Sequence, residues 1–156
     1  MLGVDPGTAV TGYGVIETGN GSPGMGRLVE CGVIRFTGRS PLPRRLHELH
    51  QHIAGLIDRH RPGALALENA FYHKNVHTTL VLGHARGVIM LAAQQAGIVI
   101  AEYAPATIKK TVAGAGGAPK AQIGGVVARL LRLKAAPKPS DAADGVAVAL
   151  THILRS

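Results

Sequence analysis

Apolar residues at the start of the chain follow a pattern that predicts strands. Residues 2–5, 11–17 and 28–36 are short runs enriched in Val, Ile, Tyr and Phe. A Gly- and Pro-rich segment, GNGSPGMG, separates the second run from the third and predicts a hairpin loop. We therefore expect three successive antiparallel strands at the beginning of the fold.

Longer segments with apolar residues at three- and four-residue steps follow, and they alternate with short apolar runs. The pattern predicts helices over 44–59, 78–96, 118–133 and 141–154, and strands over 64–67 and 98–103. An antiparallel start followed by strand–helix alternation is typical of an α/β domain with a mixed sheet and helices on its faces. No repeat or long linker divides the chain, so we expect a single domain over residues 1–156.

The composition of the chain favours a globular protein over a membrane or secreted one. The chain has 156 residues, of which 46% are hydrophobic, and this suffices for one domain with a core. No apolar run has the length expected of a membrane span, and the N-terminus lacks the pattern of a signal peptide. A single cysteine, Cys31, cannot form an internal disulfide, so we expect a cytoplasmic protein in a reducing compartment.

The net charge of the chain and its distribution indicate the kind of partner that it binds. The 17 Lys and Arg residues outnumber 9 Asp and Glu residues, which gives a formal net charge of +8. No acidic residue lies between Glu102 and Asp141, although that interval contains seven Lys and Arg residues. A segment with charge of only one sign differs from an ordinary solvated surface and favours a polyanionic partner, with nucleic acid the leading candidate.

Four carboxylates stand at positions that suggest a site. Asp5 and Glu68 each end a predicted strand. The helical connection between these strands favours parallel pairing, which would place the two acids side by side at the sheet edge where ligands bind. Asp141 and Asp144 lie three residues apart at the start of the last predicted helix, so they share a face. Clustered carboxylates repel one another unless cations lie between them, and oxygen ligands suit Mg²⁺ or Mn²⁺. Two such ions can activate water and stabilise the leaving oxygen of a phosphodiester.

Three of these acids could instead have purely structural roles. Asp141 could cap the last helix, with Asp144 completing a capping box. Asp5 could be an ordinary turn residue before Pro6. A zinc site is not indicated, because the eight histidines join no cysteine cluster and the HExxH pattern is absent.

The motifs GVDPGT, VTGYGVIE, ALENAFYHKN, LGHARGV and PSDAADGVAVALTH occur in this order over nearly the whole chain. Together they resemble the RuvC family of Holliday-junction resolvases. The resemblance implies an RNase H-like fold, with a five-stranded mixed sheet flanked by helices on both faces. It also implies a homodimer that nicks opposite strands of a four-way DNA junction with Mg²⁺ or Mn²⁺, and a RuvA–RuvB branch-migration complex as partner.

The resemblance also assigns residues. The family's acidic tetrad falls on Asp5, Glu68, Asp141 and Asp144, as catalytic residues and metal ligands. Its junction-contacting loop falls on the segment after Glu68, where the proposed DNA contacts are Phe71, Tyr72 and Lys74. Lysines that the family uses for junction binding and cleavage match Lys109 and Lys120, and Lys110 is a neighbouring candidate. Arg86 could face DNA or the dimer partner.

Alternative functions remain to be distinguished. The Asp-x-Gly-Thr turn also occurs in ATPases and sugar kinases of the actin type, but these have two such lobes and this chain has one copy of the motif. A non-catalytic junction-binding protein would use the acids as helix caps. A nuclease of the same fold that acts on RNA is a further possibility.

Overall fold

The computed structural model describes residues 1–19, 26–36, 40–69, 75–114 and 119–156, apart from the side chains of residues 120 and 121. The described strands are β1 (Leu2–Asp5), β2 (Val10–Glu17), β3 (Arg27–Arg35), β4 (Ala64–Glu68) and β5 (Val99–Tyr103). The described helices are α1 (Leu42–His60), α2 (Val76–Gln95), α3 (Pro105–Ala113), α4 (Lys120–Leu130) and α5 (Ser140–Arg155).

The five strands form one mixed sheet in the order β3-β2-β1-β4-β5. The first three strands pair antiparallel to one another, whereas β1, β4 and β5 are parallel neighbours. The predicted antiparallel start and the predicted parallel pairing of the Asp5 and Glu68 strands are therefore confirmed. Parallel pairing follows from the helical connections between these strands, which bring the chain back to the same end of the sheet.

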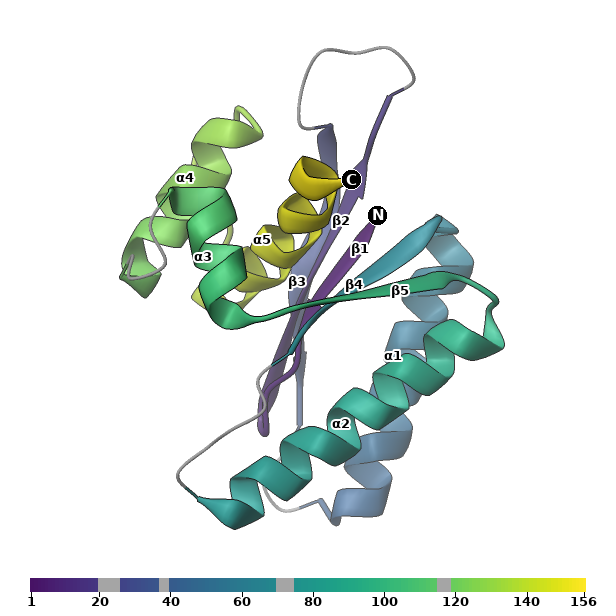
Figure 1. Ribbon diagram of the computed structural model, residues 1–156. Coiled ribbons are helices and arrows are strands. Elements are labelled where there is room, and N and C mark those ends of the chain that lie inside the picture. Colours follow the sequence, from purple (N-terminus) through teal and green to yellow (C-terminus); the bar gives the residue numbers. More distant parts are fainter. Residues whose placement is uncertain (20–25, 37–39, 70–74, 115–118) are drawn as a thin grey trace.

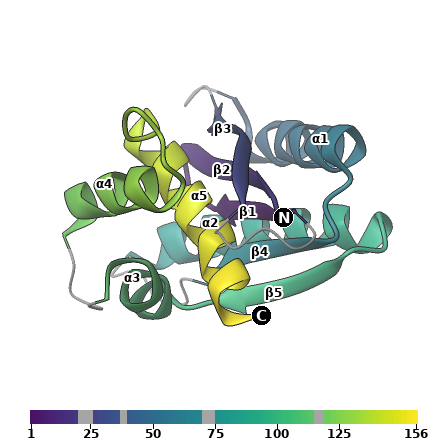
Figure 2. The ribbon, with the colours of Figure 1, turned by 90° about the horizontal axis from the view of Figure 1, so that it is seen from above.

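Helices cover both faces of the sheet and define two cores (Figure 1). On one face, α1 and α2 pack against alternate strand residues, including Leu2, Val4 and Leu65. On the other face, α5 lies directly on the sheet and α3 and α4 pack against it, as the view from above also shows (Figure 2). Strand alternation thus separates the two cores, because successive side chains point to opposite faces.

A helix that the sequence analysis did not predict, α3, lies between β5 and α4. It begins with Pro105 at a position where proline is favoured, and Gly114 in the left-handed conformation (φ 77°) ends it. Ile108 and Val112 on this helix are buried against α5. The predicted helix 118–133 is correspondingly shorter, Lys120–Leu130.

A polar cluster fastens the end of α1 to β2 and β3. The Tyr13 hydroxyl donates to Glu30 Oε1 at 2.8 Å, and His60 Nε2 lies 2.7 Å from Glu30 Oε2. Burial, together with the hydrogen bond to Glu30 and its charge, raises the pKa of Tyr13 to about 12. Burial alone would raise the pKa of Glu30, but the hydrogen bonds from His60 and Tyr13 and the charge of Arg59 outweigh it, so this pKa lies below its ordinary value.

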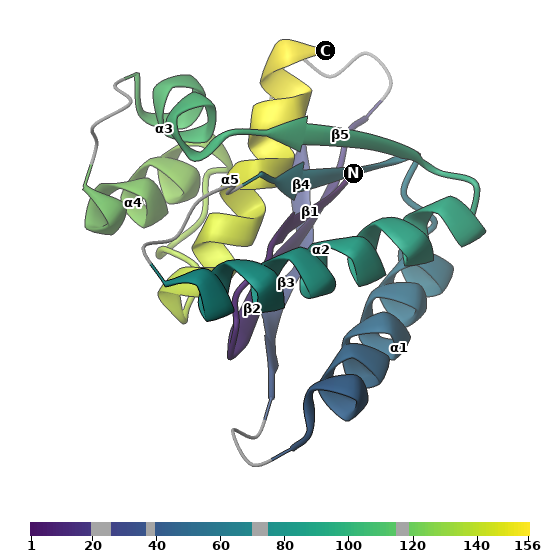
Figure 3. The same cartoon turned by 60° about the horizontal axis from the view of Figure 1, so that its bottom comes forward.

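The expectation that no segment has the length and composition of a membrane span is wrong for helix α2. It has the length and apolar composition of a membrane span, with a mean hydropathy of 1.3 over 18 residues, of which 28% are buried. One such helix is weak evidence for a span, because a helix packed on a soluble core passes the same test. Here Ala85, Ile89 and Ala93 belong to the core that α1 and α2 form with the sheet. Among the helices and strands that the structure describes, none covers the outer face of α2 (Figure 3).

Candidate active site

Strand alternation places two of the predicted acids on the α5 face of the sheet. Leu2 and Val4 of β1 belong to the α1/α2 core, so Asp5 at the next position points to the opposite face. Leu67 of β4 belongs to the same α1/α2 core, and Glu68 therefore also points toward α5. Because Val4 and Leu67 are register partners in parallel strands, Asp5 and Glu68 end those strands side by side.

Glycines allow α5 to lie unusually close to the sheet. A Cβ atom on Gly3 would overlap the backbone of α5, and one on Gly12 would overlap the carbonyl oxygen of Asp141. A Cβ atom on Gly14 would lie 2.5 Å from Cγ2 of Val146, well inside a normal contact. The glycines of the first two strands thus set the distance at which α5 holds its acidic residues above the strand ends.

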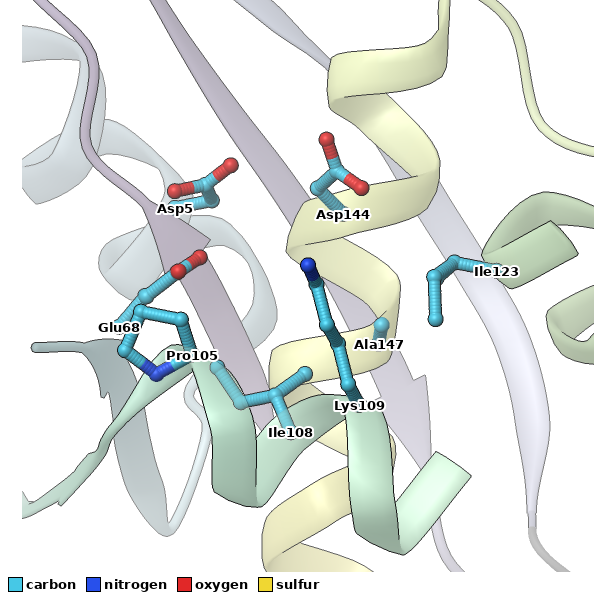
Figure 4. Close-up of a pocket in the computed structure, with 8 residues that line it drawn as sticks. All are labelled: Asp5, Glu68, Pro105, Ile108, Lys109, Ile123, Asp144 and Ala147. Carbon is cyan, nitrogen blue, oxygen red and sulfur yellow. The ribbon is translucent and has the colours of Figure 1, made fainter. Parts of the chain in front are cut away.

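A cavity of about 220 Å³ lies where these elements meet (Figure 4). Three of the four predicted acids line it: Asp5 from β1, Glu68 from β4 and Asp144 from α5. One oxygen of Asp144, Oδ2, is itself buried. The structure therefore brings together carboxylates that are far apart in the sequence, as the metal-site hypothesis requires.

Lys109 on α3 supplies the positive charge of the cavity. Its side chain lines the cavity, and its amine is directed toward the three carboxylates (Figure 4). Ile108 and Ile123 form part of an apolar wall beside it. Low polarity at this wall strengthens the electrostatic interaction of Lys109 with the acids and with any bound phosphate.

Asp141 lies one turn before Asp144 on α5 and is not among the described residues that line the cavity. The N-cap of α5 is Pro139, so Asp141 lies inside the helix and not at the capping position. The alternative in which Asp141 caps the helix and Asp144 completes a capping box is therefore wrong. Asp141 lies in the first turn of α5, where its charge interacts favourably with the helix dipole.

The donor set of the cavity fits a hard divalent cation. Its three carboxylates come from separate elements, and neither His nor Cys occurs among the described residues that line it. Across the described ranges, however, no group of three or more His, Cys, Asp or Glu side chains is arranged as a ready-made metal cluster. Like-charged carboxylates repel one another, so the three acids line one cavity without approaching one another closely.

Arg45 of α1 holds the turn that follows Asp5, and the sequence analysis did not identify it. Its guanidinium donates to the carbonyl oxygen of Thr8 and lies 5.6 Å from the ring centre of Phe36. The backbone N–H of Gly7 also donates to Thr11 Oγ1 at 3.5 Å. No local sequence pattern predicts this role of Arg45, because its contact with Thr8 joins residues 37 positions apart.

The structure tests the predicted DNA contacts only in part. Lys110 is exposed on α3, one residue beyond the cavity-lining Lys109. Lys120 begins α4, but its side chain lies outside the described part of the structure. Phe71, Tyr72 and Lys74 also lie outside the described residues, between Glu68 and the start of α2.

Arg86, for which the sequence allows either DNA or a dimer partner, pairs within its own chain. Its guanidinium forms an ion pair with Glu102 of β5, and only 17% of the Arg86 side chain is exposed. This contact ties α2 to the edge strand of the sheet.

Asn75 begins α2 as its N-cap, and its side chain accepts a hydrogen bond from the Thr78 N–H at 3.1 Å.

Comparisons with known proteins agree with this geometry. Residues 1–152 match the family model described as "Crossover junction endodeoxyribonuclease RuvC". A protein of that name from Halorhodospira halophila is 47% identical over 152 residues, covering 97% of this chain and 88% of the relative.

Solved structures give the same result. The RuvC structure from Thermus thermophilus is 33% identical with a TM-score of 0.88, over 99% of this chain and 94% of that one. The same Thermus protein in complex with a Holliday junction substrate is 32% identical with a TM-score of 0.90, covering 99% and 92% of the two chains. The predicted RNase H-like fold is confirmed. The chain belongs to the RuvC family of crossover junction endodeoxyribonucleases.

Proposed function

We propose that this protein resolves four-way DNA junctions by paired, symmetric nicks, through metal-dependent hydrolysis of phosphodiester bonds in DNA recombination and repair. The observation that carries the proposal is the cavity at the ends of β1 and β4, where Asp5, Glu68, Asp144 and Lys109 meet. The Thermus relative, which shares this fold, was solved with a Holliday junction. RuvC nucleases are metal-dependent, and the carboxylate donors of the cavity suit such a reaction.

The acids would hold the metal. We assign Asp5, Glu68 and Asp144 as ligands from within the cavity, and Asp141 as the fourth acid one turn away on α5. Mg²⁺ or Mn²⁺ suits these oxygen donors, and we propose two ions per active site. When bound, such cations make water a better nucleophile at neutral pH and stabilise charge on the phosphate oxygens.

The remaining groups of the cavity position and neutralise the substrate. The amine of Lys109 can bind a phosphate oxygen and offset the charge that develops during hydrolysis. The apolar wall of Ile108 and Ile123 limits water around this charge, so the interaction is stronger than at an open surface. The turn held by Arg45 and the close packing of α5 fix Asp5 and Asp144 before substrate arrives.

Residues near the cavity would contact the junction. Lys110 and Lys120 lie on α3 and α4 and would meet phosphates, together with Lys74. Phe71 and Tyr72 would stack on unpaired bases at the crossover, since aromatic stacking tolerates any base. These assignments rest on the family motifs and on the acid-free composition of residues 103–140.

We propose a homodimer, because nicks on opposite strands require two active sites. The uncovered face of α2 provides a suitable surface: Val76, Leu80 and Leu91 are 74%, 57% and 51% exposed. Gly83 and Gly87 lie between them on the same stripe, and a Cβ atom on either would have no described atom within 4 Å. Two copies of this helix could pack face to face in an isologous interface.

We also propose a RuvA–RuvB complex as a further partner, and a cytoplasmic location for the protein.

The test is the Asp5→Asn variant, assayed on a labelled synthetic four-way junction. It keeps the shape of the side chain but removes its charge, so we expect nicking to fall by at least about 10²–10³-fold, the scale for one preorganised electrostatic group. Junction binding should persist. The matched control is Asp58→Asn, the same change at an exposed position of α1, which should nick like the wild type. Normal nicking by Asp5→Asn would exclude the assigned site.

A further inference from the structure

A second group of cations lies outside the catalytic cavity, at the end of α4 and in the segment that leads to α5. Arg129 is in the last turn of α4, and Arg132, Lys134 and Lys138 follow within the next nine residues. All four side chains are exposed. None of them lines the cavity that holds Asp144. We refer to these four residues as the 129–138 cations.

Four arginines elsewhere in the fold form ion pairs with acids, and the 129–138 cations differ from these four. Such pairs are Arg27–Glu17 at 2.8 Å, Arg44–Glu48 at 3.1 Å, Arg59–Glu30 at 3.6 Å, and Arg86–Glu102. Within the part of the chain that the structure describes, no carboxylate pairs with any of the 129–138 cations. Their charge is therefore available to a partner of opposite sign.

Local structure does not account for the position of two of these cations. Lys138 immediately precedes Pro139, the N-cap of α5, where the positive end of the helix dipole disfavours another positive charge. Arg132 has φ 54°, a left-handed conformation that favours Gly or Asn over Arg. Arg129, in contrast, complements the negative end of α4. A favourable interaction with a helix end would thus explain Arg129 but neither Arg132 nor Lys138.

A groove between α4 and the start of α5 is lined by one of these cations, Lys138. Its lining includes Gly124 of α4, Ala136, Lys138, and Ala143 of α5, and its volume is about 740 Å³. A Cβ atom on Gly124 would lie 3.3 Å from Cβ of Ala136, so the segment before α5 packs closely on α4 at this point. Ala143 directly precedes Asp144, and the groove therefore borders the helical turn that carries a catalytic acid.

We infer that the 129–138 cations bind phosphates of a duplex arm of the junction, next to the strand that enters the active site. This inference rests on the proposed function and adds a contact surface to it. Exposed cations without acidic partners bind the DNA backbone independently of sequence, and they do so by releasing counterions. The shallow apolar groove beside Lys138 leaves room for the backbone to pass along α4 and α5.

The experiment compares three triple variants of the full-length chain in junction binding at several salt concentrations. In the first, Arg129, Lys134 and Lys138 each become Gln. The second keeps the charge, as Arg129→Lys, Lys134→Arg and Lys138→Arg. The third removes the same amount of charge elsewhere, as Arg27→Gln, Arg44→Gln and Arg155→Gln, all at exposed positions. Fluorescence anisotropy gives the binding constant, with EDTA present so that no cleavage occurs.

The slope of log K against log salt is negative, and each lost phosphate contact reduces its magnitude by about 0.9, so the slope of the first variant should be less steep by about 2.7. The charge-keeping variant and the Arg27/Arg44/Arg155 variant should retain the wild-type slope. An unchanged slope in the first variant, or an equal loss in the third, would overturn the inference.

Wild-type nicking of the junction, measured on the same preparation with metal, separates this inference from the proposed function. If the wild type nicks junctions and the first triple variant keeps the wild-type slope, only the 129–138 surface is wrong. If the wild type neither binds nor nicks junctions, the proposed function itself fails.

Discussion

The close packing of α5 on the sheet makes Gly14→Ala an informative substitution. Its new methyl group would lie 2.5 Å from Cγ2 and 2.7 Å from Cα of Val146. Carbon atoms in favourable contact are separated by about 3.5–4.0 Å, so α5 must move away from β2 by about 1 Å. The backbone of Val146 cannot rotate aside as a flexible side chain could.

The displacement has two measurable consequences. Overpacking of this kind lowers the free energy of unfolding by about 1–3 kcal/mol. With an unfolding entropy of about 2.1 cal/mol/K per residue, a chain of this size loses roughly 3 °C in Tm per kcal/mol, or about 3–9 °C in total. Because α5 also carries Asp144, a shift of about 1 Å should slow junction cleavage by on the order of 10²-fold.

Calorimetry and single-turnover cleavage of a four-way junction, below the Tm of both proteins, measure the two effects. Gly55→Ala is the matched control, since Gly55 lies within α1 and a Cβ atom there contacts nothing within 4 Å. We expect Gly55→Ala to raise stability by about 0.5–1 kcal/mol and to leave cleavage unchanged. Wild-type stability and wild-type cleavage in Gly14→Ala would refute the packing argument.

Two further predictions concern the groups that hold the site and the sheet. Arg45→Ala removes the hydrogen bond to Thr8, and we expect junction cleavage to slow by about 10–100-fold while junction binding in a gel-shift assay is retained. Arg45→Lys should restore part of the cleavage rate. Unchanged cleavage in Arg45→Ala would show that the turn after Asp5 does not depend on Arg45. The pKa of Glu30 is lower in the folded protein than its ordinary value of 4.5, so its contribution to stability is present at neutral pH and is lost as the pH falls through the folded pKa. Thermal unfolding from about pH 6 to pH 3 should therefore show a smaller loss of Tm in Glu30→Gln than in the wild type, and parallel curves would contradict the assigned ion pairing.

The positions of Asp5 and Glu68 at the ends of two predicted strands made much of the site predictable. Each of the two runs is apolar and ends in a single acid, and the carboxyl ends of parallel neighbouring strands meet at the edge of the sheet where ligands bind. The helical connection between these runs predicted their parallel pairing, and the register of β1 with β4 confirms it. The placement of Asp144 above them required only that the last helix pack on the same face.

Features that depend on contacts between distant segments could not be predicted from the sequence. Helix α3 has nine residues, including two Thr and one Val, and its own propensity is low. Its stability comes from Ile108 and Val112 packed against α5, a contact that no local pattern encodes. The contact of Arg45 with the turn after Asp5 and the pairing of Arg86 with Glu102 likewise join separate elements.

The central claim is that the cavity at the ends of β1 and β4 is a metal-dependent nuclease site for four-way junctions. The most direct measurement incubates the wild-type protein with a labelled synthetic junction, and with linear duplexes of the same arms, in Mg²⁺, Mn²⁺ or EDTA. Paired symmetric nicks in the junction alone, present with either metal and absent in EDTA, are the predicted result. Binding without nicks in every condition would contradict the claim, as would equal cutting of the linear duplexes.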